Sequence, residues 1–587
     1  MSKYSTLVNI LDTIIKEAPT SMSKKYSSDE SDNEQLNQSR SRAFIHLYLK
    51  VSFGLLLFEE REHFLTDGSY DGGIDGYYIN PENKTIYLIQ SKFRTNDKNF
   101  ENKQIAFEEI LTMDVNRILD GETKDERGNE YNGKIKQLQR EISNTDSIGR
   151  YSYQIVILAN LADVKSSDLR KLSGGIACEV FNFETCYQKL VFPVITGTFF
   201  NATDLSINID LSNKNAGSKI SYTVQTKKGK CEITVLFIPT IELAKVMFKY
   251  KNSILKFNPR SYLGHEGKNV HNSIRETITQ SETNEFALFN NGITMLSDET
   301  YINEKIGQKN KAQLIVKNPQ IINGGQTSYT LSKIFEENIE NNVEEIFKDK
   351  EVLIKIITLQ ENNDIANKLD LINAISDATN KQTPIINADR FSNEKLQIDL
   401  QKTLFDNYNL HYERKRGEFA DGIYNNYITE NSIIERNHFY KMFYASNGKI
   451  DKASEKKLFY KQGLTIDDFS KDELDNAYFG HLCFKRINGA KNPHERVDIA
   501  DFAKIYAMTY VFKPKSVEDY QNAIDENIEA FNSKWTDFLN YFTKSTVITK
   551  IRIDKITGEK KSYQKMDYRK WYNSSDFAND VAFFYND

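Results

Sequence analysis

Residues 72–94 constrain the fold most narrowly, because they place a glycine pair before two apolar runs that are separated by a short polar turn. The turn at residues 81–84 has the length expected of a β-hairpin. Successive side chains of a strand point to opposite faces, so Gln90 and Lys92 share one face of the second strand. Pairing of the strands brings Asp75 near the end of the second strand. The sequence therefore predicts a carboxylate, an amide and an ammonium group in one place.

This combination of groups is suited to chemistry on a phosphodiester. A Mg²⁺ ion held by one or two carboxylates keeps most of its waters, and it can lower the pKa of one water and neutralise charge on a phosphate oxygen. Lys92 would orient that water or stabilise the transition state. We therefore predict Asp75, Gln90 and Lys92 as catalytic residues, with Mg²⁺ or alternatively Mn²⁺ as cofactor. In the competing interpretation, Lys92 only reaches into solvent and Gln90 is an ordinary polar residue.

The segments around the hairpin extend this prediction. Residues 43–60 are strongly apolar, and a hydrophobic stripe at helical spacing leads to Glu60. We therefore expect one helix over 43–60, with Glu60 as a second metal carboxylate beside Asp75. Residues 21–42 are polar and predict a flexible loop. Residues 103–119 predict a helix and residues 153–159 a buried strand, which gives the order helix, strands, helix, strand.

With Asp75 and the sequence Gln90-Ser91-Lys92, this order of elements resembles the PD-(D/E)XK nuclease superfamily, in particular the Mrr-like restriction endonucleases. The resemblance implies an α/β domain over residues 1–165 that cuts DNA with a bound metal ion. A neutral Gln90 is a weaker ligand for a hard cation than a carboxylate, so the charge must come from Asp75 and Glu60. The alternative is a binding or sensor protein that has kept the nuclease fold without the activity.

Ordered motifs in the second half of the chain form a second signature. They read KFNPRSYLG from residue 256, FNNGIT from 289, NPQIINGGQTS from 318, NKQTP from 380 and YERKRGE from 412. These motifs resemble the AIPR family, named for abortive infection and phage resistance, over residues 236 to 587. The resemblance implies a role in anti-phage defence, with the AIPR part controlling the nuclease. A third alternative is that the AIPR part acts alone on nucleotides or RNA, with the first domain only binding DNA.

The glycine pair of the third motif predicts a ligand site. Residues 313–322 have the pattern of a strand and residues 327–338 that of a helix capped by Thr327, so the glycines would expose amides at a helix N-terminus. No Lys-Ser or Lys-Thr follows the glycines, which excludes the usual mononucleotide loop, and a tight turn without a ligand is the competing interpretation. Amides, hydroxyls and arginines in the motifs suit a nucleotide or a nucleic-acid backbone. The predicted binding residues are Arg260, Asn290, Asn291, Asn323, Gly324, Gly325, Gln326, Thr327, Asn380, Gln382, Arg414 and Arg416.

A basic segment near the end of the chain is a further candidate for nucleic-acid contact. Residues 544–570 hold nine Lys or Arg against three Asp or Glu, with Tyr563, Tyr568 and Trp571 among or beside them. This mixture could bind phosphates and stack bases, and a solvated basic hairpin is an equal alternative. The formal net charge of −5 is compatible with such a local basic surface.

The length of 587 residues predicts two to four domains in a mixed α/β chain. We expect a nuclease domain at 1–165, a β-rich connection at 166–240 with strands near 205–211 and 231–238, and an AIPR domain at 241–587. Its part from residue 391 onward is expected to be mostly helical, with helices at 501–510 and 517–531. Four cysteines without a Cys-x-x-Cys pattern argue against zinc and disulfides.

The longest apolar stretch, residues 51–58, is far shorter than a membrane span. We therefore expect a cytoplasmic, metal-dependent endonuclease whose partner is nucleic acid, DNA before RNA. The oligomeric state stays open, as does a nucleotide ligand at the Gly-Gly loop.

Overall fold

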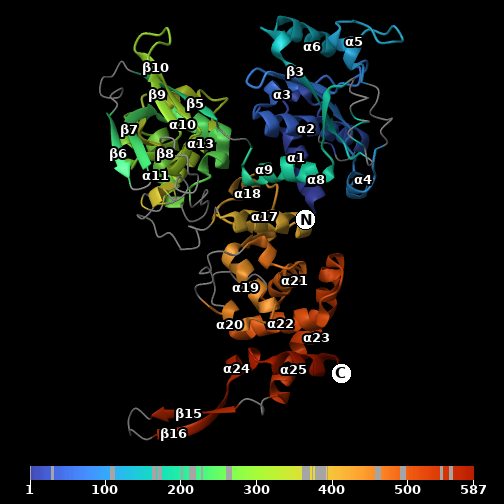
Figure 1. The fold of residues 1–587 in the computed structure, drawn as a ribbon, viewed down its shortest axis with the longest axis vertical. Helices are drawn as coiled ribbons and strands as arrows, with labels where there is room; N and C mark the ends of the chain where they lie inside the picture. Colours follow the sequence, from blue (N-terminus) through green and yellow to red (C-terminus); the bar gives the residue numbers. More distant parts are fainter. Residues whose placement is uncertain are drawn as a thin grey trace. The chain divides into compact units, whose positions relative to one another are not determined.

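We describe a computed structural model of the chain, whose helices and strands are drawn in Figure 1. The chain forms two compact units. The first unit comprises residues 1–384 and 415–430, and the second comprises residues 385–414 and 431–587. The structure describes residues 2–27, 29, 32–105, 113–161, 165, 167, 169, 175–199, 203–210, 220–226, 229–258, 268–359, 371–372, 374–376, 378, 392, 394–455, 465–488, 498–542, 547–553 and 560–586.

The N-terminal part of the first unit is built on a four-stranded mixed sheet of order β1-β2-β3-β4. Its strands are β1 (Gly76–Asn80), β2 (Thr85–Ser91), β3 (Ser152–Leu158) and β4 (Ala177–Val180). β1 and β2 are antiparallel, whereas β3 and β4 run parallel to their neighbours. The predicted hairpin with its turn at 81–84, the predicted strand at 153–159 and the mixed α/β class are thus confirmed.

Helices pack on the two faces of this sheet, as the alternation of side chains in β2 requires. On one face, α2 (Asn33–Phe53) comes so close that a Cβ on Gly76 would lie 3.0 Å from the Ile45 side chain. On the other face, Ile86 and Leu88 share a buried core with α6 (Gly133–Asn144). Gln90 continues the row of Ile86 and Leu88 at the end of the strand.

The helix expected over residues 43–60 is wrong at both ends. α2 begins ten residues earlier, at Asn33, because the side chain of Asp32 accepts a hydrogen bond from the amide of Gln35 and caps it. It ends at Phe53, because Gly54 adopts a left-handed conformation with φ of 66°. The new helix α3 (Phe58–His63) then starts after the extended residue Leu57. The flexible loop predicted for 21–42 is therefore helical from residue 33 onward.

The helix predicted for 103–119 is only partly present. α5 (Val115–Leu119) occupies its end, residues 103–105 are not helical, and residues 106–112 lie outside the described residues.

The remainder of the first unit contains two sheets, of order β5-β10-β9 and β11-β8-β12-β7-β6. Their strands are β5 (Asp204–Asp210), β6 (Ile220–Thr226), β7 (Gly229–Pro239), β8 (Ile293–Ser297), β9 (Glu299–Asn303), β10 (Lys311–Lys317), β11 (Gln320–Asn323) and β12 (Glu351–Leu359). The helices α10 (Thr240–Tyr250) and α13 (Gly325–Glu337) contribute to the same buried core as these sheets.

These sheets change the expected division of the chain. The strands expected near 205–211 and 231–238 are present as β5 and β7, but they pair with β10 and β12 rather than forming a separate connection. β4 pairs with β3 across the expected boundary at residue 165. Residues 166–240 are therefore shared between the N-terminal sheet and the two central sheets.

The second unit is mostly helical, as predicted from residue 391 onward. The helices expected at 501–510 and 517–531 correspond to α22 (Ile499–Phe512) and α23 (Tyr520–Tyr541). An antiparallel pair, β15 (Val547–Ile553) and β16 (Lys560–Met566), forms a hairpin within the basic segment. Trp571 is not available for stacking on a base, because it is 1% exposed and its ring nitrogen donates to Asp580.

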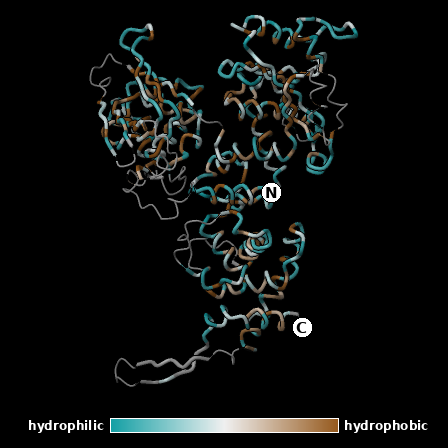
Figure 2. The backbone as a smooth tube through the Cα atoms, in the orientation of Figure 1, coloured by the Kyte–Doolittle hydropathy of each residue, from teal (hydrophilic) through white to brown (hydrophobic). Residues whose placement is uncertain are grey.

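Hydrophobic segments gather inside the folded parts of the chain, and hydrophilic segments are more common toward their outside (Figure 2). Among the described residues, no helix combines the length and the apolar character that a bilayer crossing requires.

Candidate metal centre

The loop that leads into β1 carries an aspartate at every fourth position, at residues 67, 71 and 75. Gly72 and Gly73 turn the chain between the last two, with φ values of 63° and 75°. A Cβ on Gly72 would lie 2.7 Å from the side chain of Ile118, so this position needs glycine for space as well as for conformation. The tight turn folds the loop back toward the sheet.

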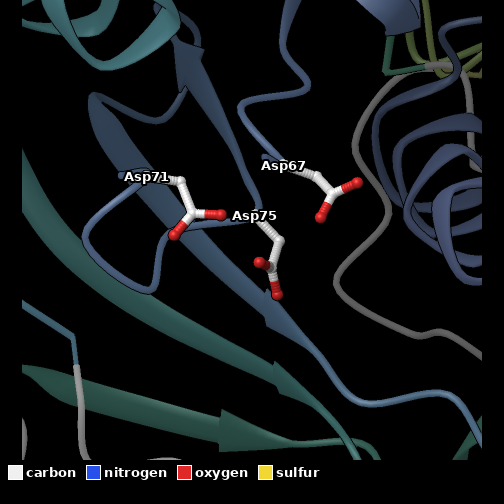
Figure 3. Close-up of side chains that lie close together, drawn as sticks. All are labelled: Asp67, Asp71 and Asp75. Carbon is white, nitrogen blue, oxygen red and sulfur yellow. The ribbon is translucent and has the colours of Figure 1, made fainter. Parts of the chain in front are cut away.

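The folded loop gathers three carboxylates at the start of β1. One oxygen from each of Asp67, Asp71 and Asp75 lies within 4.8 Å of those of the other two. In Figure 3, Asp75 lies between Asp71 and Asp67, beside the hairpin. The backbone holds Asp67 beside Asp75, because the carbonyl of Asp75 accepts hydrogen bonds from the amides of Thr66 at 3.0 Å and Asp67 at 3.1 Å.

The three carboxylates differ in their hydrogen bonds. Asp71 accepts from the amides of Gly73 at 2.8 Å and Gly68 at 3.1 Å, one on each oxygen. Asp75 accepts from the amide of Ser91 at 2.7 Å through Oδ2. Asp67 accepts from Nε of Arg42 at 2.7 Å, also through Oδ2. Asp71 is thus bound into the loop, whereas Asp67 and Asp75 each keep one oxygen without a hydrogen bond from the described residues.

Gln90 faces this group from β2. Gly76 pairs with Ile89 and the amide of Asp75 donates to the carbonyl of Ile89, so the next pair in this register is Asp75 opposite Gln90. Opposite residues of an antiparallel pair project from the same face. Gln90 is 2% exposed, and its Oε1 is buried without a hydrogen-bond partner in the described part of the chain. A buried acceptor without a partner is costly unless something else binds it.

Lys92 lies just beyond the end of β2, where its amide donates to the carbonyl of Leu158 at 3.0 Å. Its side chain is exposed, and its charge acts on Asp75 and Asp71. The structure thus brings together the three residues that the sequence predicted as catalytic.

The pKa of Asp75 differs from that of an ordinary surface carboxyl. Burial raises its pKa to about 7, and the neighbouring charges of Asp71 and Asp67 add to this effect. The amide of Ser91 and the charge of Lys92 favour the ionised form but do not compensate. Burial also raises the pKa of Asp71. Crowded carboxylates with too little positive charge are the arrangement that a divalent cation would relieve.

Glu60 does not belong to this group, which corrects the prediction. It lies exposed in the first turn of α3, and the acidic group found in the described residues contains only the three aspartates. The reason is the break at Gly54, which ends the hydrophobic stripe before it reaches Glu60.

Asp67 and Asp71 were missed, because a loop has no periodicity from which a shared face can be inferred. The fourfold spacing of aspartates among glycines was the signal that could have found them.

The Gly-Gly loop of the central part brings two of the predicted motifs together. The side-chain amide of Asn290 donates to the hydroxyl of Thr327 at 3.1 Å, and β8 pairs with β11 between them. Gly324 is the N-cap of α13 with φ of 88°, and a Cβ there would collide with the Ile293 side chain. Thr327 is therefore not the cap that was predicted, since it already lies inside the helix.

Other predictions for this loop need adjustment. The strand expected at 313–322 is divided into β10 and β11, because Asn318 turns the chain with φ of 48° before Pro319. The side chain of Asn323 accepts from the amide of Gly324 at 2.7 Å, and Gly325 begins α13.

Among the remaining predicted residues, Asn291 is exposed and Gln326 is half-buried. Arg416 and Arg414 fall in different compact units. Arg260, Asn380 and Gln382 lie outside the described residues.

Comparison with known families identifies part of the chain. Residues 255–488 match the family model described as AIPR protein. The match confirms the AIPR resemblance within those residues, which include the Gly-Gly loop and make up less than half of the chain. The acidic group around Asp75 lies before the matched residues. No curated protein and no solved structure matches the chain.

Proposed function

We propose that the chain is an anti-phage defence effector in which the N-terminal part is a metal-dependent endonuclease acting on DNA. The observation that carries the proposal is the convergence of Asp75, Gln90 and Lys92 at a group of undercompensated carboxylates. The defence role rests on the AIPR match at residues 255–488. We assign to that AIPR part the control of the nuclease.

The donors around Asp75 fit a hard divalent cation. Carboxylate and amide oxygens are the ligands of Mg²⁺ and Mn²⁺, and no soft ligand is among them. Asp75 and Gln90 would hold the ion, and the buried Oε1 of Gln90 would gain the partner that it lacks among the described residues. When bound, the ion would activate a water and neutralise charge on a phosphate.

Lys92 has a separate role in this proposal. Its side chain is exposed and its charge acts on Asp71 and Asp75, so the ammonium group can approach a phosphate from solvent. There it would stabilise the negative charge that grows on the phosphate oxygens in the transition state. Exposure of Lys92 fits contact with a large substrate better than a role in the core.

The second candidate is a nucleic-acid or nucleotide sensor without cleavage. It is favoured by Gln90, since a neutral amide leaves the cation with one charge fewer than the acid usual at this position of the nuclease family. It predicts binding of nucleic acid that is insensitive to Lys92→Met and no cleavage with any metal.

The test is cleavage of plasmid, single-stranded DNA and RNA side by side by the full chain, with Mg²⁺, Mn²⁺ or EDTA. We expect metal-dependent nicking of plasmid that is lost, by at least about a hundredfold, in Asp75→Asn and Lys92→Met. Glu60→Gln is the matched control, because it removes an exposed carboxylate outside the acidic group. Unimpaired cleavage in both site variants would refute the assignment of this site.

A further inference from the structure

The oxygens around Asp75 divide into those already used by the fold and those still available. Both oxygens of Asp71 accept amide hydrogen bonds, from Gly68 and Gly73. Asp67 and Asp75 each accept a hydrogen bond through Oδ2 only, and the buried Oε1 of Gln90 accepts none from the described residues. Within the described residues, one oxygen from each of Asp67, Asp75 and Gln90 is therefore left without a hydrogen bond.

We infer that Asp67 is the second carboxylate ligand of the cation, replacing the acid that Gln90 does not supply, while Asp71 shapes the loop. This inference rests on the proposed function, because it assigns a further ligand to the same metal. Two carboxylates and one amide give a net charge of −2 at the ion, which matches a divalent cation. The independent sign of a ligand is Gln90, which lies opposite Asp75 in the hairpin register and whose buried Oε1 has no hydrogen-bond partner among the described residues.

The backbone holds Asp67 where such a ligand has to be. The carbonyl of Asp75 accepts from the amide of Asp67, so the two residues stay adjacent whatever their side chains do. The neighbouring Thr66 is fixed as well, since its carbonyl accepts from the side-chain amide of Asn132 at 3.0 Å. Asp67 therefore lies on a segment tied at two points rather than on a freely moving loop.

Arg42 acts as a positioning residue for Asp67. Its Nε binds Oδ2 of Asp67, and its Nη1 donates to the carbonyl of Lys25 at 3.0 Å, which anchors the guanidinium from the opposite side. A charge-assisted hydrogen bond of this kind is strong and orients the carboxylate. The pair leaves Oδ1 of Asp67 available, so Arg42 and a cation can bind the same carboxylate at once.

The experiment is a titration of the full chain with Mn²⁺, in which the electron paramagnetic resonance signal of the unbound ion measures how much Mn²⁺ is bound. The variants are Asp67→Asn, Asp71→Asn and Asp75→Asn, which keep shape and remove one charge, with Glu60→Gln as control. We expect Asp67→Asn and Asp75→Asn each to weaken Mn²⁺ binding at least tenfold, and Asp71→Asn less than threefold. Thermal unfolding in EDTA checks that each variant is folded.

The outcomes separate this inference from the function on which it rests. Parent-like binding in Asp67→Asn, together with weakened binding in Asp75→Asn, would overturn the role of Asp67 and leave the nuclease proposal standing. Parent-like binding in both would overturn the metal site altogether. A loss in Asp71→Asn as large as that in Asp67→Asn would contradict the division of roles between the two.

The Arg42→Gln variant distinguishes positioning of Asp67 from a general contribution to the fold, with Mn²⁺ affinity as the measured quantity. If Arg42 orients Asp67, its loss weakens Mn²⁺ binding in the parent and has no further effect in Asp67→Asn. Equal losses in both backgrounds would overturn the positioning role.

Discussion

Two carboxylates of the first unit, Asp75 and Asp421, are both withdrawn from solvent but meet opposite surroundings. Asp421 lies in α18 (Ala420–Tyr424) and is 3% exposed. It forms ion pairs with Lys251 at 3.4 Å and Lys333 at 3.7 Å and accepts from the hydroxyl of Tyr329 at 3.1 Å. Burial opposes its ionisation, but the two lysines and the hydroxyl outweigh burial and lower its pKa.

Asp75 has no such compensation, and its pKa is raised rather than lowered. The charged groups that act on it include two more carboxylates, and Lys92, whose positive charge also acts on it, is exposed. A buried charge that the protein neutralises by itself is a structural element, whereas one that it leaves undercompensated is a candidate for an external cation. The comparison predicts opposite responses when each charge is removed.

The largest effect is expected for Asp421→Asn. Removing the charge leaves two lysines close together, with Lys333 only 9% exposed, and breaking a buried ion pair in this way costs about 3–5 kcal/mol. Urea unfolding should show this loss, and the first unit should unfold at a lower denaturant concentration. Glu299→Gln is the control, since its pair with Lys317 is exposed and should change stability by less than about 0.5 kcal/mol.

If Asp421→Asn cost less than about 1 kcal/mol, the lysines would be solvated or would find other partners. Asp421 would then not be a carboxylate whose charge stabilises the fold, and its contrast with Asp75 would no longer hold.

The second effect has the opposite sign. Asp75→Asn should stabilise the protein by about 2 kcal/mol at pH 8 in EDTA, because it removes a partly buried charge that is repelled by Asp71 and Asp67. Asparagine can still accept the hydrogen bond from the amide of Ser91. Destabilisation by Asp75→Asn under these conditions would contradict the undercompensated state of the carboxylates.

The pH dependence of this difference follows from the raised pKa. Between the ordinary pKa of 3.8 and the folded value of about 7, the native protein binds a proton at Asp75 that the unfolded chain has lost. Stability of the parent therefore falls as the pH rises through this window, and the gap to Asp75→Asn opens with it. Unfolding curves of both proteins from pH 4 to pH 8 test this, and a gap of equal size at every pH would show another cause.

The two carboxylates also show which contacts can be predicted from the sequence and which cannot. The neighbourhood of Asp75 and Gln90 was predictable, because a short turn and the period of two determine which strand residues meet. The contribution of Asp67 was not, since it depends on how a glycine-rich loop folds back. Asp421, Lys251 and Lys333 are far apart in the sequence and meet only through packing of helices. Glu60 was misplaced because a single left-handed glycine, Gly54, ends the preceding helix.

A smaller loss is expected for Tyr329→Phe, which removes one hydrogen bond to Asp421 and keeps the ring. The two lysines remain, so the carboxylate stays neutralised and the cost should be about 1 kcal/mol. Urea unfolding in parallel with Asp421→Asn measures it. In the double variant, the two losses should not add, because the hydroxyl has lost its charged acceptor.

The smallest effect on stability, less than about 0.5 kcal/mol, is expected for Lys92→Met, which removes a positive charge that acts on Asp75. Lys92 is exposed, so the fold gains little from its charge. Its loss should nevertheless abolish cleavage, because no ammonium group would then stabilise the negative charge of the phosphate in the transition state. Unfolding in EDTA and plasmid nicking in Mg²⁺, measured on the same preparation, separate the two properties. If the variant were destabilised by more than about 1 kcal/mol, Lys92 would stabilise the fold, as Lys251 and Lys333 do.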